Sequence, residues 1–390
     1  MNQIKNVPVY LVYCVFSVVF VADYNLNTDI SRNILDIVWG GLFLCASTFA
    51  YAKLIQSFKL SEQTVVFIFL TSIITSIYLV KYLAFQDNFY LFDVLAFAME
   101  MKIFFYAFFS VVWLYVFRDV DVKSFSIAGV FLSIVIIVSV LIESILNGGL
   151  VRGHGSGEIN YDALLLLLAL VASLFGHEKV SKKVVYIILL GLLITLSRTS
   201  LIVLAFVVFF YTNINFYKKI LVFVFSISLV VSSFVLRDLE VDLSKVDRFA
   251  MYESAYHGFS KDSNFFGNFP GLSIDLETPE QLNWLWNKQS EEHGLSGLYP
   301  FHLHAMWLRF HFTFGLIVSS AIFFYFIYSS ILSKNKLRRV LSFVIVMQGL
   351  TMGVFYISNV SIPLILLYLS TRYMATGEKA SVLRRFQSKY

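Results

Sequence analysis

The chain has 390 residues, of which 58% are hydrophobic and only 14% are charged, and its mean hydropathy is +0.76. A water-soluble globular protein carries roughly 25% charged residues, so this chain has too few charges to cover a water-facing surface. The composition excludes a large soluble domain and predicts an integral membrane protein. The net charge of +5 does not indicate nucleic-acid binding, because basic residues in membrane proteins mark the cytoplasmic side.

Long apolar runs along the chain predict membrane-spanning helices, since about 18 to 20 apolar residues are needed to cross a bilayer. Lipid offers the backbone no hydrogen bonds, so each run is predicted to be helical. In chain order, the clear runs are residues 7–22, 34–52, 64–85, 92–117, 125–146, 161–176, 220–236 and 303–332.

Two further runs, residues 184–211 and 340–369, carry polar residues near their middles and basic residues at both ends. Basic flanks place both ends of a run in the cytoplasm, which requires an even number of crossings. Each run is therefore predicted to be a pair of short helices with its tip toward the outside. With this assignment, the cytoplasmic segments carry about 19 Lys and Arg, and both termini are cytoplasmic. The predicted fold is all-α and polytopic, with about 12 transmembrane helices.

One long segment, residues 237–302, is left outside the membrane and holds about 11 acidic and five basic residues. Its Gly, Pro, Asn and Trp content predicts a compact, partly helical cap. Since no soluble domain is visible, residues 1–390 are predicted to form a single integral membrane domain. Arg152 lies in a shorter outside loop, residues 147–160, which either contacts a ligand or is a plain connector.

Arg198 stands at the predicted tip of the first helix pair, next to Ser197. A helix of about 13 residues rises only about 20 Å, which is less than the roughly 30 Å hydrocarbon core. Arg198 is therefore expected at or below the outer interface, beside a wet cavity. Its fork of N–H donors suits a phosphate or diphosphate. The alternative is an arginine that merely extends to the interface.

Other polar residues near the outer face are candidates for the same site. Arg248 lies in a predicted amphipathic helix, residues 247–253, and either points into the site or pairs with a neighbouring carboxylate. His302 and His304 stand close to the start of the 303–332 run. Their spacing makes no helical metal chelate, so no metal site is predicted. A neutral histidine there is either a general base or part of an interfacial polar belt.

Arg309 lies deeper in the same run. It either binds phosphate or pairs with a carboxylate of another helix, such as Glu100.

Taken in order, these motifs resemble the O-antigen polymerase and O-antigen ligase superfamily of bacterial polysaccharide assembly. The resemblance covers residues 161–330 and consists of Leu196-Ser197-Arg198-Thr199, then Arg248 followed by Gly258, Gly267 and Gly271, then His304 followed by Gly315. The family usually has His-Asn where this chain has His304-Ala305, so His302 stays open as the alternative base.

The resemblance implies an all-helical fold like that of glycosyltransferases with lipid-linked donors, here an oligosaccharide on undecaprenyl diphosphate. It implies that Arg198 and Arg248 bind the diphosphate and that His304 deprotonates the acceptor hydroxyl. No cofactor is expected. Further substrate-binding candidates are Arg152, Ser197, Tyr252, Trp284, His302 and Arg309.

The preferred function is an O-antigen polymerase in the bacterial inner membrane, with its active site on the periplasmic face. A ligase that transfers polymer to lipid A core is the runner-up, and a transporter of the lipid-linked sugar is the alternative of another class. Expected partners are the lipid-linked oligosaccharide and membrane lipid, and a chain-length regulator is a candidate partner. No nucleic-acid partner is expected.

Overall fold

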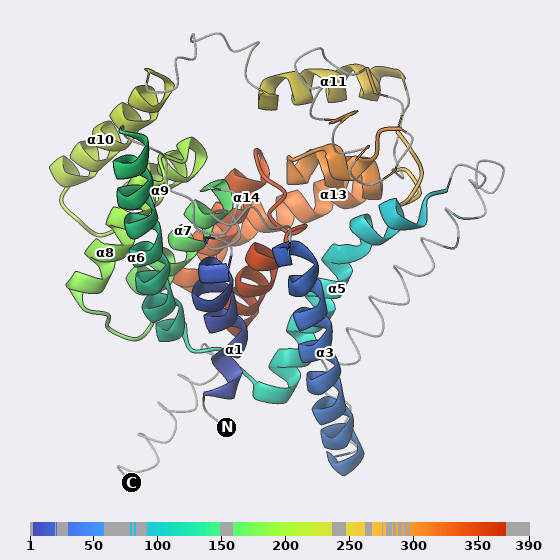
Figure 1. Cartoon of the computed structure of the whole chain (residues 1–390), viewed down its shortest axis with the longest axis horizontal. Coiled ribbons are helices and arrows are strands. Elements are labelled where there is room, and N and C mark those ends of the chain that lie inside the picture. The colour runs from blue at the N-terminus through green and yellow to red at the C-terminus, as the bar shows by residue number, and fades with distance from the viewer. Residues whose placement is uncertain are drawn as a thin grey trace.

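Helices and the segments that join them make up the described part of the chain. The computed structural model describes residues 3–19, 21, 30–57, 79, 82, 92–148, 159–235, 247–261, 267–274, 276–277, 283, 286–287, 291, 294 and 297–371. Every regular element within these residues is a helix, in agreement with the all-α prediction. Figure 1 shows the helices packed into a bundle, with α11 (Asp247–Lys261) lying across its upper end.

The first half of the chain supplies the helices expected from the early apolar runs. At the N-terminus, η1 (Ile4–Asn6), α1 (Val7–Tyr10) and a wider helical turn, η2 (Leu11–Phe16), follow one another directly. The next helices are α3 (Ile30–Ser57), α5 (Val94–Phe117), α6 (Val122–Asn147) and α7 (Ile159–Phe175). The predicted run 64–85 lies outside the described residues, apart from positions 79 and 82.

The second half contains both predicted interruptions. The first run is divided into α8 (Lys182–Ile194) and α9 (Arg198–Tyr211), and the second into α14 (Lys336–Gly349) and a C-terminal helix (Ser358–Thr371). The elements between α9 and α14 are α10 (Phe216–Val235), α11, the short turn η5 (Pro300–His302) and α13 (Met306–Leu332). Neither run is therefore one continuous helix, and the number of membrane crossings stays a prediction.

Three of the described helices, α5, α6 and α13, are long and apolar enough to cross a membrane. Shorter apolar helices include α7, α9 and the C-terminal helix. Large apolar side chains on the long helices are exposed, among them Leu141 and Ile145 on α6 and Phe324 on α13. An extended apolar surface of this kind is unusual for a soluble monomer and suits contact with lipid.

Helix α7 forms the buried centre of the bundle. Every side chain from Ala163 to Ala172 is no more than 2% exposed, as expected for a helix that is apolar all round. Small residues allow its neighbours to approach closely, because a Cβ added at Gly129 of α6 would lie 2.4 Å from Cβ of Ala169. The N-terminal turn of α7, with Asn160, is thereby fixed inside the molecule.

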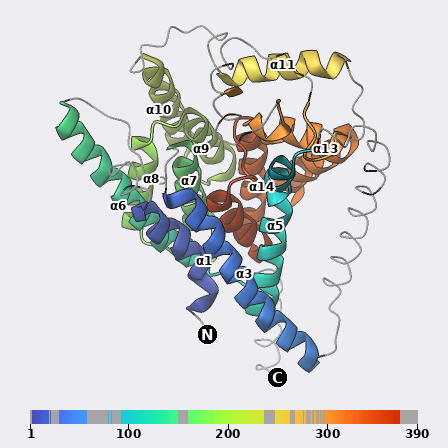
Figure 2. The same ribbon diagram turned by 45° about the vertical axis from the view of Figure 1, so that its right-hand side comes forward.

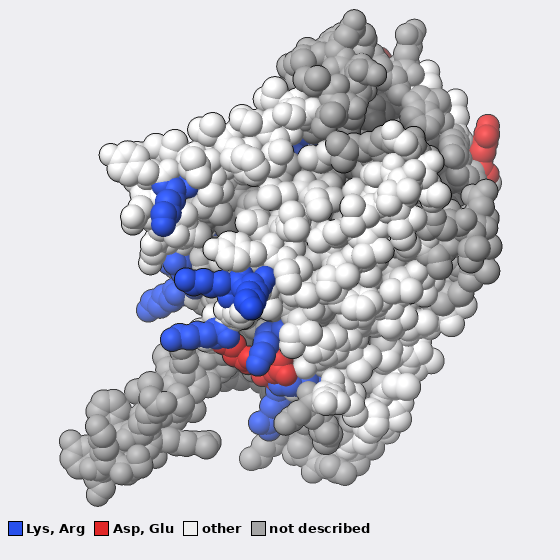
Figure 3. Space-filling view, turned by 60° about the vertical axis from the view of Figure 1, so that its left-hand side comes forward, with Lys and Arg blue, Asp and Glu red and all other residues white. Residues whose placement is uncertain are grey.

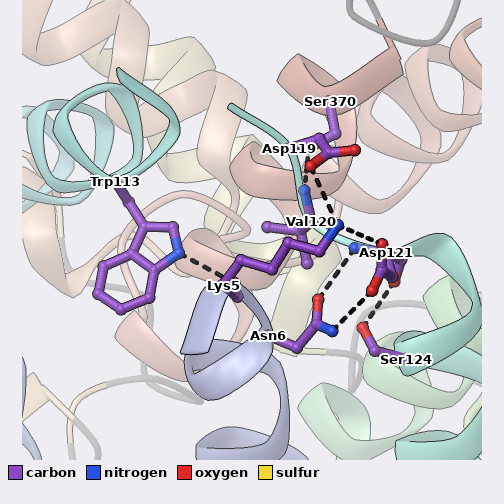
Figure 4. Close-up of polar contacts among 8 residues, drawn as sticks. All are labelled: Lys5, Asn6, Trp113, Asp119, Val120, Asp121, Ser124 and Ser370. Carbon is purple, nitrogen blue, oxygen red and sulfur yellow. Dashed lines mark hydrogen bonds and ion pairs between the residues drawn. The ribbon is translucent and has the colours of Figure 1, made fainter. Parts of the chain in front are cut away.

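Segments far apart in the sequence meet at a three-way junction formed by Lys5, the connector 119–121 and Ser370 (Figure 4). The Lys5 ammonium lies 3.1 Å from Asp119 and 2.5 Å from Asp121, and the Val120 N–H donates to Ser370 Oγ at 3.2 Å. Burial alone lowers the pKa of Lys5, but its hydrogen bonds and Coulombic attraction to Asp121 and Asp119 outweigh burial and raise that pKa. Residues from the beginning, the middle and the end of the described chain are therefore held on the same side of the bundle.

Helix α13 contains a break that was not predicted. Residues 303–332 were predicted to form one helix, but α13 begins at Met306 and is interrupted at Gly315, whose φ is 79°. Asn268 of the cap donates its N–H to the Phe312 carbonyl at 2.6 Å. Gly267, with a φ of 72°, lies against the backbone of Gly315. The cap segment therefore pairs directly with the interruption in α13.

Replacing Gly267 by alanine is expected to destabilise the protein by about 3 kcal/mol, because a Cβ there would lie 2.3 Å from the backbone nitrogen of Gly315. The matched control is Gly294→Ala, since Gly294 also has a positive φ, of 63°, but has open space around its Cβ position. That control carries only the left-handed strain of about 1 kcal/mol. The fraction of each variant that stays folded in detergent during heating measures the difference. Equal losses would show that the contact with Gly315 adds nothing.

Candidate functional site

Three separate parts of the chain meet at the 350–357 loop, which joins α14 to the C-terminal helix. From α9, Thr199 lies beside Thr351, with their hydroxyl oxygens 3.1 Å apart. From α11, the Tyr252 hydroxyl donates to the Leu350 carbonyl at 2.6 Å. From the start of α13, the Met306 N–H donates to the Met352 carbonyl at 3.1 Å. Figures 1 and 2 both show α11 lying over α13 and α14.

Arg198 is the first residue of α9, at the interruption of the first run. The chain turns there through Leu196, which has a left-handed φ of 50°, and Ser197 stands at the N-cap position. Thr195 stabilises the end of α8 by donating its hydroxyl to the Leu192 carbonyl at 2.7 Å. The Arg198 side chain is half-buried, and its neighbour Thr199 contacts the 350–357 loop. Arg198 is thus at a helix break, as predicted.

Ser197, a predicted substrate contact, is fully buried. Its hydroxyl lies 3.2 Å from Oδ1 of Asn160 in α7 and 3.4 Å from Oγ of Ser200. These contacts give Ser197 partners inside the protein and make it part of the support of the turn before Arg198.

Helix α11 includes the predicted amphipathic segment 247–253 and extends it to Lys261. Tyr252 is half-buried, and its bond to the Leu350 carbonyl fixes α11 to the 350–357 loop. Arg248 lies one helical turn before Tyr252, since residues four apart follow one another on the same face of a helix. The Arg248 side chain lies outside the described part of the structure. Tyr252 thus connects the helix that carries Arg248 to the loop that Thr199 contacts.

The two candidate histidines differ in their surroundings. His302 is fully buried, and its Nδ1 accepts a hydrogen bond from the Tyr299 N–H at 3.0 Å. Its ring stacks on Phe301 with centroids 4.2 Å apart. His304 is half-buried and lies in the extended link before α13. Its carbonyl oxygen lies 3.5 Å from the Cβ position of Gly353 in the 350–357 loop. This geometry favours His304 over His302 as a residue that reaches a substrate.

Arg309 is buried at 7% exposure. Its guanidinium carbon lies 3.4 Å from the ring centroid of Tyr356, and Nη2 donates to the Met99 carbonyl of α5 at 3.1 Å. The fully buried Glu100 follows Met99 and attracts the guanidinium. Of the two roles predicted for Arg309, attraction to Glu100 favours pairing with a carboxylate over binding phosphate. The contacts with Met99 and Tyr356 also make Arg309 a link between α13, α5 and the 350–357 loop.

Two further predicted substrate contacts, Arg152 and Trp284, lie outside the described residues. Sequence reasoning also missed residues that the structure brings to the site, namely Asn160, Ser200, Gln348 and Thr351. Their only signal in the sequence is that polar side chains interrupt apolar runs, which is costly in a membrane unless those side chains find partners.

Comparisons with protein-family models, curated proteins and solved structures give no match. The chemistry of the site therefore has to be inferred from its own residues. They provide a half-buried arginine at a helix start, next to Thr199, which contacts the 350–357 loop, and a half-buried histidine whose backbone carbonyl lies beside that loop. A guanidinium can grip an anionic leaving group, and an imidazole can accept a proton at neutral pH.

Proposed function

We propose that this chain is an O-antigen polymerase, a membrane glycosyltransferase that joins oligosaccharide repeat units carried on undecaprenyl diphosphate. The observation that supports this proposal best is that Thr199 next to Arg198, Tyr252 of α11 and the backbone of His304 all lie against the 350–357 loop. Segments that carry the residues singled out by the family resemblance, from three distant parts of the sequence, thus meet at one short loop. The resemblance supplies the substrate class, and the geometry supports a shared site.

In the proposed reaction, the acceptor sugar hydroxyl attacks the anomeric carbon of the donor sugar. The bond from that carbon to the diphosphate oxygen breaks, and undecaprenyl diphosphate leaves. His304 accepts the hydroxyl proton. Arg198 and Arg248 stabilise the negative charge that develops on the diphosphate. Direct displacement inverts the anomeric carbon, and the two guanidinium groups supply the positive charge without a metal ion.

The proposal includes the predicted topology in a bacterial inner membrane, with about 12 crossings, both termini in the cytoplasm and residues 237–302 in the periplasm. Figure 3 shows Lys and Arg side chains gathered along one side of the molecule. Exposed lysines in the described connectors and at helix starts support a cytoplasmic side. These lysines are Lys123, Lys179, Lys182, Lys183, Lys218, Lys334 and Lys336. The basic side suits the anionic lipid surface of a cytoplasmic leaflet.

A transporter of the same lipid-linked sugar is the second candidate function. The observation that favours it is the set of helix interruptions, at residues 195–197, at Gly315 and at residues 350–357. Transporters build their binding sites from such broken helices. A ligase with the same fold is the remaining alternative to a polymerase.

A gel of surface polysaccharide from a strain lacking this protein separates the three functions. For a polymerase, the strain is expected to show lipid A core carrying a single repeat unit and no longer chains. Loss of a ligase would leave core alone, while lipid-linked polymer accumulates. Loss of a transporter would leave core alone, while single lipid-linked units accumulate on the cytoplasmic face. A ladder like that of the parent strain would overturn all three.

A further inference from the structure

A row of polar side chains, half-buried at Asn160 and otherwise buried, runs from α7 to α14 past the turn that carries Arg198. Asn160 Oδ1 lies 3.2 Å from Ser197 Oγ, which lies 3.4 Å from Ser200 Oγ. Gln348 Nε2 donates to Ser200 Oγ at 3.1 Å. Ser197, Ser200 and Gln348 are all 0% exposed. The row therefore connects the helix break at Arg198 with the last turn of α14, immediately before the 350–357 loop.

The hydrogen bonds along this row have a defined direction. Asn160 Oδ1 can only accept, and the Ser197 hydroxyl donates toward it and, at the longer distance, toward Ser200 Oγ. The Gln348 amide is the donor to Ser200 Oγ. The Gln348 side chain therefore acts in this row as a hydrogen-bond donor, which an apolar group cannot do.

This arrangement leaves the other end of the Gln348 amide unsatisfied. Oε1 is buried and has no hydrogen-bond partner in the described part of the chain. Turning the amide over would only exchange the two ends. An apolar side chain of similar length would remove the unsatisfied carbonyl together with the one bond that is made, so its net effect on stability is expected to be small. Gln348 therefore contributes more to the position of the turn than to the stability of the fold.

We propose that Gln348 is a positioning residue for Arg198. It holds the Ser197–Ser200 turn against α14, and this fixes the guanidinium relative to the 350–357 loop and to His304. The inference rests on the proposed function, in which Arg198 grips the diphosphate of the donor. A displacement of about 1 Å between a catalytic group and its target costs about 100-fold in rate. The loss falls mainly on turnover, because the additional negative charge on the leaving oxygen is absent in the bound donor and develops as the transition state is reached.

The test uses the full-length protein in lipid vesicles with an undecaprenyl-diphosphate-linked oligosaccharide as donor. Gln348→Met is expected to lower kcat about 30-fold to 100-fold and to change KM for the donor less than about threefold. Because Gln348 acts through Arg198, the same change made in Arg198→Lys is expected to add less than about threefold. A residue of purely structural importance would cause the same loss in both backgrounds.

Ser342→Ala is the matched control. Ser342 is 0% exposed, lies on the same helix and takes part in a comparable buried group with Ser329 and Tyr368, but in the middle of α14, six residues before Gln348. It is expected to keep wild-type kcat. If Gln348→Met does not fold, Ser200→Ala interrupts the same row with a smaller change and is expected to give the same drop in kcat.

If Gln348→Met keeps wild-type turnover while the turnover of Arg198→Lys is lowered, Gln348 does not position Arg198. The proposed function would then stay intact. Equal losses in the wild-type and Arg198→Lys backgrounds would also overturn the positioning role. Wild-type turnover in both Gln348→Met and Arg198→Lys would remove the proposed role of Arg198, and the inference with it.

Discussion

Arg198→Ala is expected to abolish long-chain polysaccharide while the amount of inserted protein stays normal. In the proposed reaction, the guanidinium stabilises charge that develops on the departing diphosphate, and loss of such a group typically costs about 10²- to 10³-fold in rate. Arg198 is only half-buried and lies at the first position of α9, so alanine there is expected to leave the fold intact. The measurements are a polysaccharide gel and an immunoblot of the membrane fraction.

Arg198→Lys is expected to be impaired as well, because one ammonium cannot reproduce the two parallel N–H bonds of a guanidinium. The control is Lys183→Ala, which removes an exposed positive charge from the start of α8, at the other end of the same helix pair. It is expected to leave the chain-length distribution unchanged. Normal chain length in both Arg198→Ala and Arg248→Ala would count decisively against the glycosyltransferase proposal.

His304→Ala is expected to lower turnover per folded molecule by about 10²- to 10⁴-fold, which is the usual contribution of a general base. In the wild type, turnover is expected to fall in acid, because a protonated imidazole cannot accept the proton. In His304→Ala this acid limb is expected to disappear. The measurement is initial rate against pH for the purified protein in vesicles.

His302→Ala serves as the comparison. His302 is buried and bonds to the Tyr299 N–H, so its loss leaves a buried donor without an acceptor. The expected result is less folded protein, with turnover per folded molecule within about threefold of wild type. The opposite pattern, with catalysis lost at His302 and kept at His304, would transfer the proposed base to His302.

The helix breaks around Arg198 and the 350–357 loop could be predicted because the positions of basic residues add information to the hydropathy. Basic residues at both ends of one long run indicate that both ends lie on the same side of the membrane, so the run has to turn back. A polar residue near the middle of the run indicated where it turns. The break in α13 has no such mark. Gly315 lies in an apolar run where a glycine also suits close helix packing, and only the pairing of Asn268 with the Phe312 carbonyl reveals the interruption.

The choice between the two histidines and the role of Arg309 depend on burial, which one sequence does not show. His302 and His304 are two residues apart, yet one is fully buried and the other half-exposed, because η5 ends between them. Arg309 was recognisable as an expensive residue in an apolar run. Its partner Tyr356 lies far along the chain, and only the fold brings the two together.

The three-way junction has a consequence for the order in which the molecule is completed. The bond from Val120 to Ser370 spans 250 positions and the pair of Lys5 with Asp119 spans 114. During synthesis from the N-terminus, Lys5 meets its carboxylates as soon as the first helices are inserted. The Val120 amide, in contrast, has to wait for the C-terminal helix. A nascent chain halted before Ser370 would therefore lack the hydroxyl that accepts the Val120 hydrogen bond.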